Sequence, residues 1–233
     1  MAEYDKYANS WLYNLGDKLG DMIILSVLWL IFSLPIITIG PASAALYYAV
    51  VRRFRLGYSG TIHDFLRGFR QNLKQGVALT LIFIIYGSLV ALDILFARRG
   101  IGNFKLPSFY GQVAYVLLLP MAFTLPYVFA YLSRFSNTVK ATLRDSFFLS
   151  ASHFFHTLGI LILVIGSAIV MPLFPPAALV VPALCALICS FMIENDFAKI
   201  IADNPGAFIP SEPTSSFTNV NAPPPESETI PEI

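Results

Sequence analysis

The stretch of sequence that decides the fold is LGDMIILSVLWLIFSLPIITIGPASAALYYAVV, residues 19–51. It carries no charge after Asp21 and is long enough to be embedded in a membrane. Pro35 to Pro41 interrupts it, and a helix break inside a bilayer needs neighbouring protein to satisfy its freed backbone groups. We therefore expect the stretch to be divided in two and to fold against other helices.

The composition of the whole chain is that of a polytopic membrane protein. Hydrophobic residues make up 56% of it, the mean hydropathy is +0.68, and 12% of residues are charged, about half the roughly 25% of a soluble domain. A net charge of +1 gives no reason to expect a nucleic-acid partner. Cys185 and Cys189 lie four residues apart in an apolar run, which is typical of packing residues and predicts neither a disulfide nor a metal site.

Six apolar segments predict an all-α, polytopic membrane bundle of six transmembrane helices. Prolines 172, 175 and 176 divide the last apolar stretch as Pro35 to Pro41 divide the first, which favours a helical hairpin at each end of the bundle. The alternative is five helices, with residues 19–51 as one kinked helix. The six segments are residues 21–36, 41–54, 76–97, 109–133, 156–171 and 176–193.

The distribution of basic residues predicts the orientation. With six spans, 12 of the 15 Lys and Arg residues lie on the side that holds both termini, and only Arg98, Arg99 and Lys105 lie on the other. The positive-inside rule makes the first side cytoplasmic. Five spans would divide the same residues 10 against 5, which the rule still tolerates. We therefore expect a multi-pass protein of the cell membrane with a cytoplasmic C-terminus.

A shift of 81 residues aligns the chain with itself and predicts a parallel internal repeat. The shift matches Arg53 with Arg134 and Asp64 with Asp145, and it aligns helix, connector and helix in both copies. Because both copies run in the same direction, their twofold axis would lie along the membrane normal. Further matches pair Ala49 with Ala130, Phe54 with Phe135, Thr61 with Thr142 and Ile84 with Ile165.

The connectors are the most structured polar parts of the sequence. Residues 61–74 have the spacing of a basic amphipathic helix on the inner membrane surface. Thr61 with Asp64, and Thr142 with Asp145, have the spacing of N-terminal capping boxes. The three histidines, His63, His153 and His156, fall in these connectors without ligand spacing, so we interpret them as interfacial residues.

Three regions follow from these patterns. Residues 1–20 are a cytoplasmic N-terminal segment, residues 21–195 are the transmembrane domain, and residues 196–233 are a cytoplasmic tail. Glu194 to Asp203 can continue the last helix. From Asn204 on the chain is rich in Pro and Ser and carries only negative charges, so it cannot build a core and we expect it to be largely disordered.

Two places are candidate functional sites. Asp93 is the only acid inside a predicted span, and an intramembrane carboxylate suggests ion or proton handling, although Arg98 and Arg99 lie close enough to pair with it. The helix break is the other, because backbone groups freed at a break can line a polar cavity. A tight hairpin turn packed on other helices is the simpler interpretation. The candidate helix-break residues are Pro35, Thr38, Gly40, Pro41 and Ser43.

The sequence contains no catalytic constellation. Patterns such as HExxH, GxSxG and the phosphate-binding loop are missing, so no nucleophile, base or phosphate cradle has the spacing that chemistry needs. We also find no cluster of polar residues in the predicted core. The sequence therefore predicts a protein that is not an enzyme and that needs no cofactor or metal.

Two motifs carry a family resemblance. The pattern LPxxTxGPAxxALYY, Leu34 to Tyr48, and the pattern FxxxFxxNxKQ, Phe65 to Gln75, resemble the YesL family of bacterial membrane proteins, a family of unknown function. The similarity covers residues 16 to about 195 and leaves out the acidic tail. It implies a small protein of the bacterial cytoplasmic membrane, often encoded beside carbohydrate-uptake transporters and two-component sensors. It carries over no catalytic residues.

Two functions fit these features. The first is a non-enzymatic accessory or assembly partner of a carbohydrate-uptake or sensing system, in contact with transporter or sensor-kinase components. The second is a transporter or channel for sugars or small solutes, acting as a homo-oligomer because six short helices enclose little space. The two differ in whether polar residues converge inside the bundle, which only a structure can show.

Overall fold

The computed structural model describes residues 11–58, 60–99, 112, 115–135 and 137–203, and every element within these ranges is helical. The prediction of an all-α fold is therefore confirmed. The seven α-helices of these ranges are α2 (Trp11–Phe32), α3 (Ile39–Val50), α4 (Thr61–Arg99), α6 (Leu118–Arg134), α7 (Val139–Ser152), α8 (Phe154–Leu173) and α9 (Val181–Asp203). Three short helical elements join them: η1 (Ile36–Thr38), the π-helical η2 (Val51–Arg55) and η3 (Pro175–Leu179).

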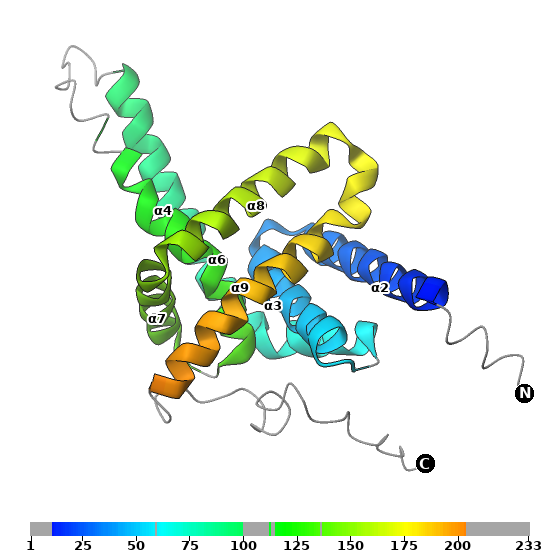
Figure 1. Ribbon diagram of the computed structural model, residues 1–233. Coiled ribbons are helices and arrows are strands. Elements are labelled where there is room, and N and C mark those ends of the chain that lie inside the picture. The colour runs from blue at the N-terminus through cyan, green and yellow to red at the C-terminus, as the bar shows by residue number, and fades with distance from the viewer. Residues whose placement is uncertain (1–10, 59, 100–111, 113–114, 136, 204–233) are drawn as a thin grey trace, which may run out of the picture.

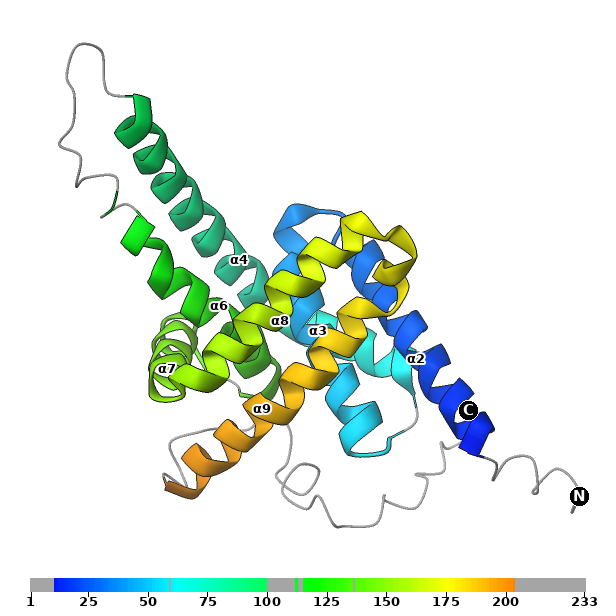
Figure 2. The ribbon, with the colours of Figure 1, turned by 45° about the horizontal axis from the view of Figure 1, so that its top comes forward.

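Helix α3 lies at the centre of the fold, in contact with α2, α4, α6 and α9. The α8–η3–α9 hairpin passes obliquely across this centre, and the far part of α4 projects away from it together with α6 (Figures 1 and 2). Helix α7 follows α6 and packs mainly against it. Most of the buried apolar side chains lie on α3 and on the helix faces that turn toward it.

Residues 19–51 form two helices, α2 and α3, joined by a turn, and not one continuous kinked helix. In the turn, Thr38 Oγ1 donates to the carbonyl oxygens of Phe32 and Pro35, both at 2.7 Å. Between the two helices, Trp29 Nε1 donates to Ser43 Oγ at 3.2 Å. The second predicted hairpin is also present, with η3 between α8 and α9.

Glycines let α3 approach α4 closely. A Cβ atom added to Gly76 would lie 2.9 Å from Pro41, and one added to Gly40 would lie 2.6 Å from a ring carbon of Phe129 and close to Thr80 Oγ1. Gly68 faces Ala45 in the same way. Small residues at such crossings allow van der Waals packing between helices, which is the main attraction available inside a bilayer.

Helix α4 differs from the expectation. The predicted connector helix and the predicted span are one continuous helix of 39 residues, about 58 Å long at 1.5 Å per residue. The connector is therefore not a separate helix on the membrane surface. The other predicted connector is a separate helix, α7, which ends before α8 begins, and His153 lies between them.

Both predicted capping boxes are wrong. Helix α7 begins at Val139, where the side chain of Thr138 accepts from the backbone N–H of Ala141, so Thr142 lies inside the helix. Thr61 is the first residue of α4, and its hydroxyl donates to Asp21 Oδ1 at 2.7 Å. The two aspartates have partners on other elements, Asp64 with Arg52 and Asp145 with Tyr131, whereas Thr142 Oγ1 is buried without a hydrogen-bond partner in the described part of the chain.

Within the described ranges, three helices are long and apolar enough to cross a membrane. They are Thr61–Ala97 of α4, α8, and Val181–Lys199 of α9, which supports the predicted location in a membrane. Helix α3 has 12 residues, about 18 Å, and α2 carries three charges in its first half. Neither of these two helices meets the same requirement alone.

The packing at Gly40 predicts a sharp difference between two glycine substitutions. Gly40→Ala should destabilise the protein by about 2 kcal/mol, because the new methyl group overlaps Thr80 and Phe129 in a packed crossing. Gly166→Ala is the control, since nothing lies within 4 Å of a Cβ atom there. Thermal unfolding in detergent, followed by size-exclusion chromatography, measures both. Equal melting temperatures for the two variants would contradict the packing described here.

Candidate functional site

The charged side chains form a network that begins at η2, the five-residue π-helical turn Val51–Arg55. Such turns are rare, and they often occur at functional positions. Arg52 Nε donates to Asp64 Oδ2 of α4 at 3.1 Å, and its guanidinium lies 4.4 Å from the centre of the Tyr58 ring. Arg52 therefore ties η2 to the first turn of α4.

The other two arginines of η2 reach two further helices. Arg53 forms ion pairs with Asp17 and Asp21 of α2. Arg55 donates to the carbonyl oxygen of Ser190 in α9 and lies over the ring of Phe191, 5.1 Å from its centre. The three arginines of η2 thus bind α4, α2 and α9, which makes η2 a junction of the bundle.

A buried ion pair joins α6 to α9. Arg134 Nη2 lies 2.8 Å from Glu194 Oε2, and each of the two side chains is only 11% exposed. Tyr47 of α3 donates to the other carboxylate oxygen of Glu194 at 3.1 Å. This contact joins three helices through one carboxylate.

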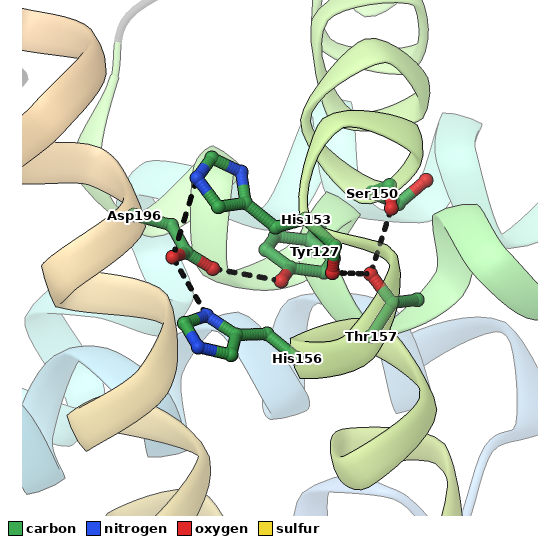
Figure 3. Close-up of polar contacts among 6 residues, drawn as sticks. All are labelled: Tyr127, Ser150, His153, His156, Thr157 and Asp196. Carbon is green, nitrogen blue, oxygen red and sulfur yellow. Dashed lines mark hydrogen bonds and ion pairs between the residues drawn. The ribbon is translucent and has the colours of Figure 1, made fainter.

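A second carboxylate of α9, Asp196, binds side chains from α6 and α8 (Figure 3). Tyr127 donates to Asp196 Oδ2 at 3.0 Å, and His156 Nδ1 lies 2.8 Å from Oδ1. His153 Nε2 lies 3.6 Å from the same oxygen. Asp196 is fully buried, so its two oxygens have exchanged water for these three side chains. We call Tyr127, His153, His156 and Asp196 the His–Asp cluster.

The corner between α7 and α8, where one helix ends and the next begins, positions the two histidines. Thr157 Oγ1 donates to the carbonyl oxygens of Ser150 at 2.8 Å and His153 at 3.0 Å, which holds the corner (Figure 3). His153 Nδ1 is buried and has no hydrogen-bond partner in the described part of the chain. A buried imidazole nitrogen without a partner leaves this cluster only partly satisfied.

The chemistry open to the His–Asp cluster is proton binding. Two imidazoles beside one carboxylate can share protons with it and with the Tyr127 hydroxyl. Within the described residues, no group of three or more His, Cys, Asp or Glu side chains has the geometry to hold a metal ion.

The candidate helix-break residues lie apart from this network. Ser43 and Thr38 use their hydroxyls inside the hairpin, Pro35 precedes η1, and Pro41 packs on Gly76. An apolar cavity of about 440 Å³ lies between η1, α3, α4 and α6. Gly40 is the one candidate helix-break residue that lines this cavity. The other lining residues include Ile36, Phe83, Met121, Leu125 and Phe129.

Asp93 is half-buried in the last part of α4. It lies near the opposite end of that helix from Asp64, so it belongs neither to the network at η2 nor to the His–Asp cluster. It is also not the only acid inside an apolar span, because Glu194 and Asp196 lie within Val181–Lys199 of α9.

The sequence analysis missed the His–Asp cluster, and the expectation of no polar cluster in the core is wrong. His153 and His156 are three residues apart, which places them close together at a helix start. The acids of α9 follow its apolar run directly, so they resemble a solvated helix end. Only the crossing of α9 over α6 and α8 buries Asp196.

Comparison with known proteins gives one match. Residues 22–94 match the family described as "Protein of unknown function, DUF624". The matched range includes the helix break, η2 and most of α4, whereas Arg134, Glu194 and the His–Asp cluster lie outside it. No curated protein matches the chain, and no solved structure does either.

The burial of the Arg134–Glu194 pair predicts a large effect of removing one partner. Arg134→Gln should lower the free energy of unfolding by about 3 kcal/mol, because it leaves a buried carboxylate without its counter-charge. Asp17→Asn, the control, should cost less than about 1 kcal/mol, since Asp17 is 54% exposed and Arg53 keeps Asp21. Chemical denaturation in detergent measures both variants. A smaller loss for Arg134→Gln than for Asp17→Asn would refute the account of this pair.

Proposed function

We propose that this chain is a non-enzymatic integral membrane protein that acts as an accessory or assembly partner of a larger membrane complex. The observation that carries the proposal is that ion pairs join the helices of the bundle to one another. Arg134 with Glu194, and Arg53 with Asp17 and Asp21, join helices to one another. Charges that form ion pairs between helices support a structural role for the protein.

The surface of the bundle supports the same proposal. Large apolar side chains are exposed along α8 and along the outer part of α4, among them Ile85, Leu89, Ile162 and Ile169. The apolar cavity beside η1 adds a concave surface between α3, α4 and α6. Such surfaces suit lipid or a transmembrane helix of a partner.

A carbohydrate-uptake or sensing system is the partner that the sequence resemblance suggests. The proposal includes membership of the YesL family, on the strength of the two motifs and of the match to a domain of unknown function over residues 22–94. The link to carbohydrate uptake rests on the resemblance alone. Transporter subunits and sensor kinases are therefore the partners to look for first.

We further propose six spans with both termini in the cytoplasm and a parallel repeat. Six separate helices occupy the six apolar segments, and helix, connector and helix recur in the same order in both halves. The network at η2 then lies at the cytoplasmic end of the bundle, where 12 of the 15 Lys and Arg residues are placed. Helices α2 and α3, which are charged or short, would insert as a hairpin supported by α4.

The six-span topology makes a prediction for thiol labelling in intact cells. In a background without Cys185 and Cys189, cysteines at Asp5, Ser59 and Lys140 should resist a membrane-impermeant maleimide, and a cysteine at Asn103 should react. Reaction at Asp5 with protection at the other two cytoplasmic positions would favour five spans. Protection at Asn103 would refute both topologies.

A second candidate function is supported by the His–Asp cluster. A buried carboxylate with two histidines inside apolar helices is the usual arrangement for proton handling in a membrane. This observation favours a proton-coupled transporter for sugars or small solutes, acting as a homo-oligomer. In that case Asp196 would bind the proton, and His153 and His156 would relay it.

One pair of measurements separates the two functions. The accessory proposal predicts a stoichiometric partner on purification from native membranes in mild detergent, and no flux of sugars or protons above empty vesicles in liposomes. Asp196→Asn should then lower stability without any transport phenotype, and the exposed His63→Gln is the control. Substrate-specific flux that Asp196→Asn abolishes and His63→Gln keeps would overturn the accessory proposal in favour of transport.

A further inference from the structure

A row of basic side chains follows one face of the first part of α4. Their spacing of four, three and four residues places them on the same side of the helix. The opposite face, with Phe65 and Gly68, packs on α3. We call this row the basic face of α4; its members are His63, Arg67, Arg70 and Lys74, and all four are exposed.

Two members of the basic face, Arg70 and Lys74, carry charge that no ion pair in the described part of the chain neutralises. The arginines at the helix junctions, such as Arg53 and Arg134, have carboxylate partners within the bundle. By contrast, neither Arg70 nor Lys74 forms an ion pair with any residue in the described ranges. Beside this face lies a cavity of about 490 Å³, in which the apolar side chains of Ile24 and Ile62 adjoin His63 and the paired charges of Arg53 and Asp21.

The complementary charge lies in the C-terminal part of the same chain. Residues 204–233 contain four glutamates and no Lys or Arg. Three of the four, Glu226, Glu228 and Glu232, fall in the last eight residues, ESETIPEI, where Ile230 and Ile233 alternate with them. This short segment thus offers both the negative charges and the apolar side chains that suit the basic face and its cavity.

The chain is long enough to bring the two together. Helix α9 ends at Asp203, and the 23 residues from there to Glu226 can span up to about 75 Å when extended. The contact of Arg55 with Ser190 and the views in Figures 1 and 2 place η2, which precedes α4, at the same end of the molecule as the end of α9. Docking within one chain also benefits from a high effective concentration.

We propose that the acidic segment 226–233 docks on the basic face of α4 and masks it. The contact is held by ion pairs of Glu228 and Glu232 with Arg70 and Lys74, and by packing of the isoleucines at the cavity beside His63. Access of any other anionic surface to this face then requires release of the segment. The inference concerns regulation, and it holds whether the protein is an accessory subunit or a transporter.

The test uses spin labels on the full chain in nanodiscs of neutral lipid. Labels on Gln71→Cys, an exposed position of α4, and on Thr229→Cys, in a background of Cys185→Ala and Cys189→Ala, report the distance by pulsed electron paramagnetic resonance. We expect a short, narrow distance population at low salt. It should be lost in 1 M salt, where the Debye length is about 3 Å.

Charge reversal identifies the groups involved. The double variant Arg70→Glu, Lys74→Glu should abolish the population with a short distance between the labels. Adding Glu228→Lys and Glu232→Lys should restore this short-distance population. Glu212→Lys, outside the acidic segment, is the control and should leave the short population unchanged. Restoration also shows that the doubly reversed α4 is folded.

Three results would overturn the proposal. The first is a broad, long distance in the unaltered charge background at low salt. The second is a short population that survives both reversal on α4 and 1 M salt. The third is a short distance in neutral lipid that is lost when phosphatidylglycerol is added, because the basic face would then belong to anionic lipid headgroups and not to the tail.

Discussion

The fold depends on one constraint, which is that a charge buried among apolar helices must find a partner there. The chain meets it by placing its arginines at helix junctions. The η2 turn sends Arg52, Arg53 and Arg55 to three different helices, and Arg134 meets Glu194 where α6 and α9 cross. Packing between apolar helices in lipid is only weakly directional, so these polar contacts select which helices become neighbours.

The same constraint links architecture to function. Helix α3 is short, yet it touches four other helices because small residues let α4 come close and because η2 extends it by one widened turn. The ion pairs at this centre join helices to one another. The His–Asp cluster is different, since His153 keeps a buried nitrogen without a partner at the corner between α7 and α8. Through Asp196 it joins α9 to Tyr127 of α6 and to His156 of α8.

The sequence predicted the helical class and the turns that separate α2 from α3 and α8 from α9, because the periodicity of apolar residues and the prolines that end helices are local signals. It did not predict that residues 61–74 and the apolar segment 76–97 form one continuous helix, α4. A glycine such as Gly76 is compatible with either the end or the continuation of a helix. It also missed Asp196, which has the sequence context of a solvated helix end and is buried only by tertiary contacts. Pairings such as Tyr47 with Glu194, 147 residues apart, have no signature in a single sequence.

The central claim is that the polar junctions hold the bundle together, and hydrogen–deuterium exchange of the protein in nanodiscs tests it most directly. If the claim is right, amides of η2 and of α9 around Glu194 exchange slowly although they lie at the charged end of the bundle, and amides of the turns at η1 and η3 exchange faster. Arg134→Gln should then speed exchange in α9 and η2 together. Exchange at η2 as fast as at η1, with no change in the variant, would contradict the claim.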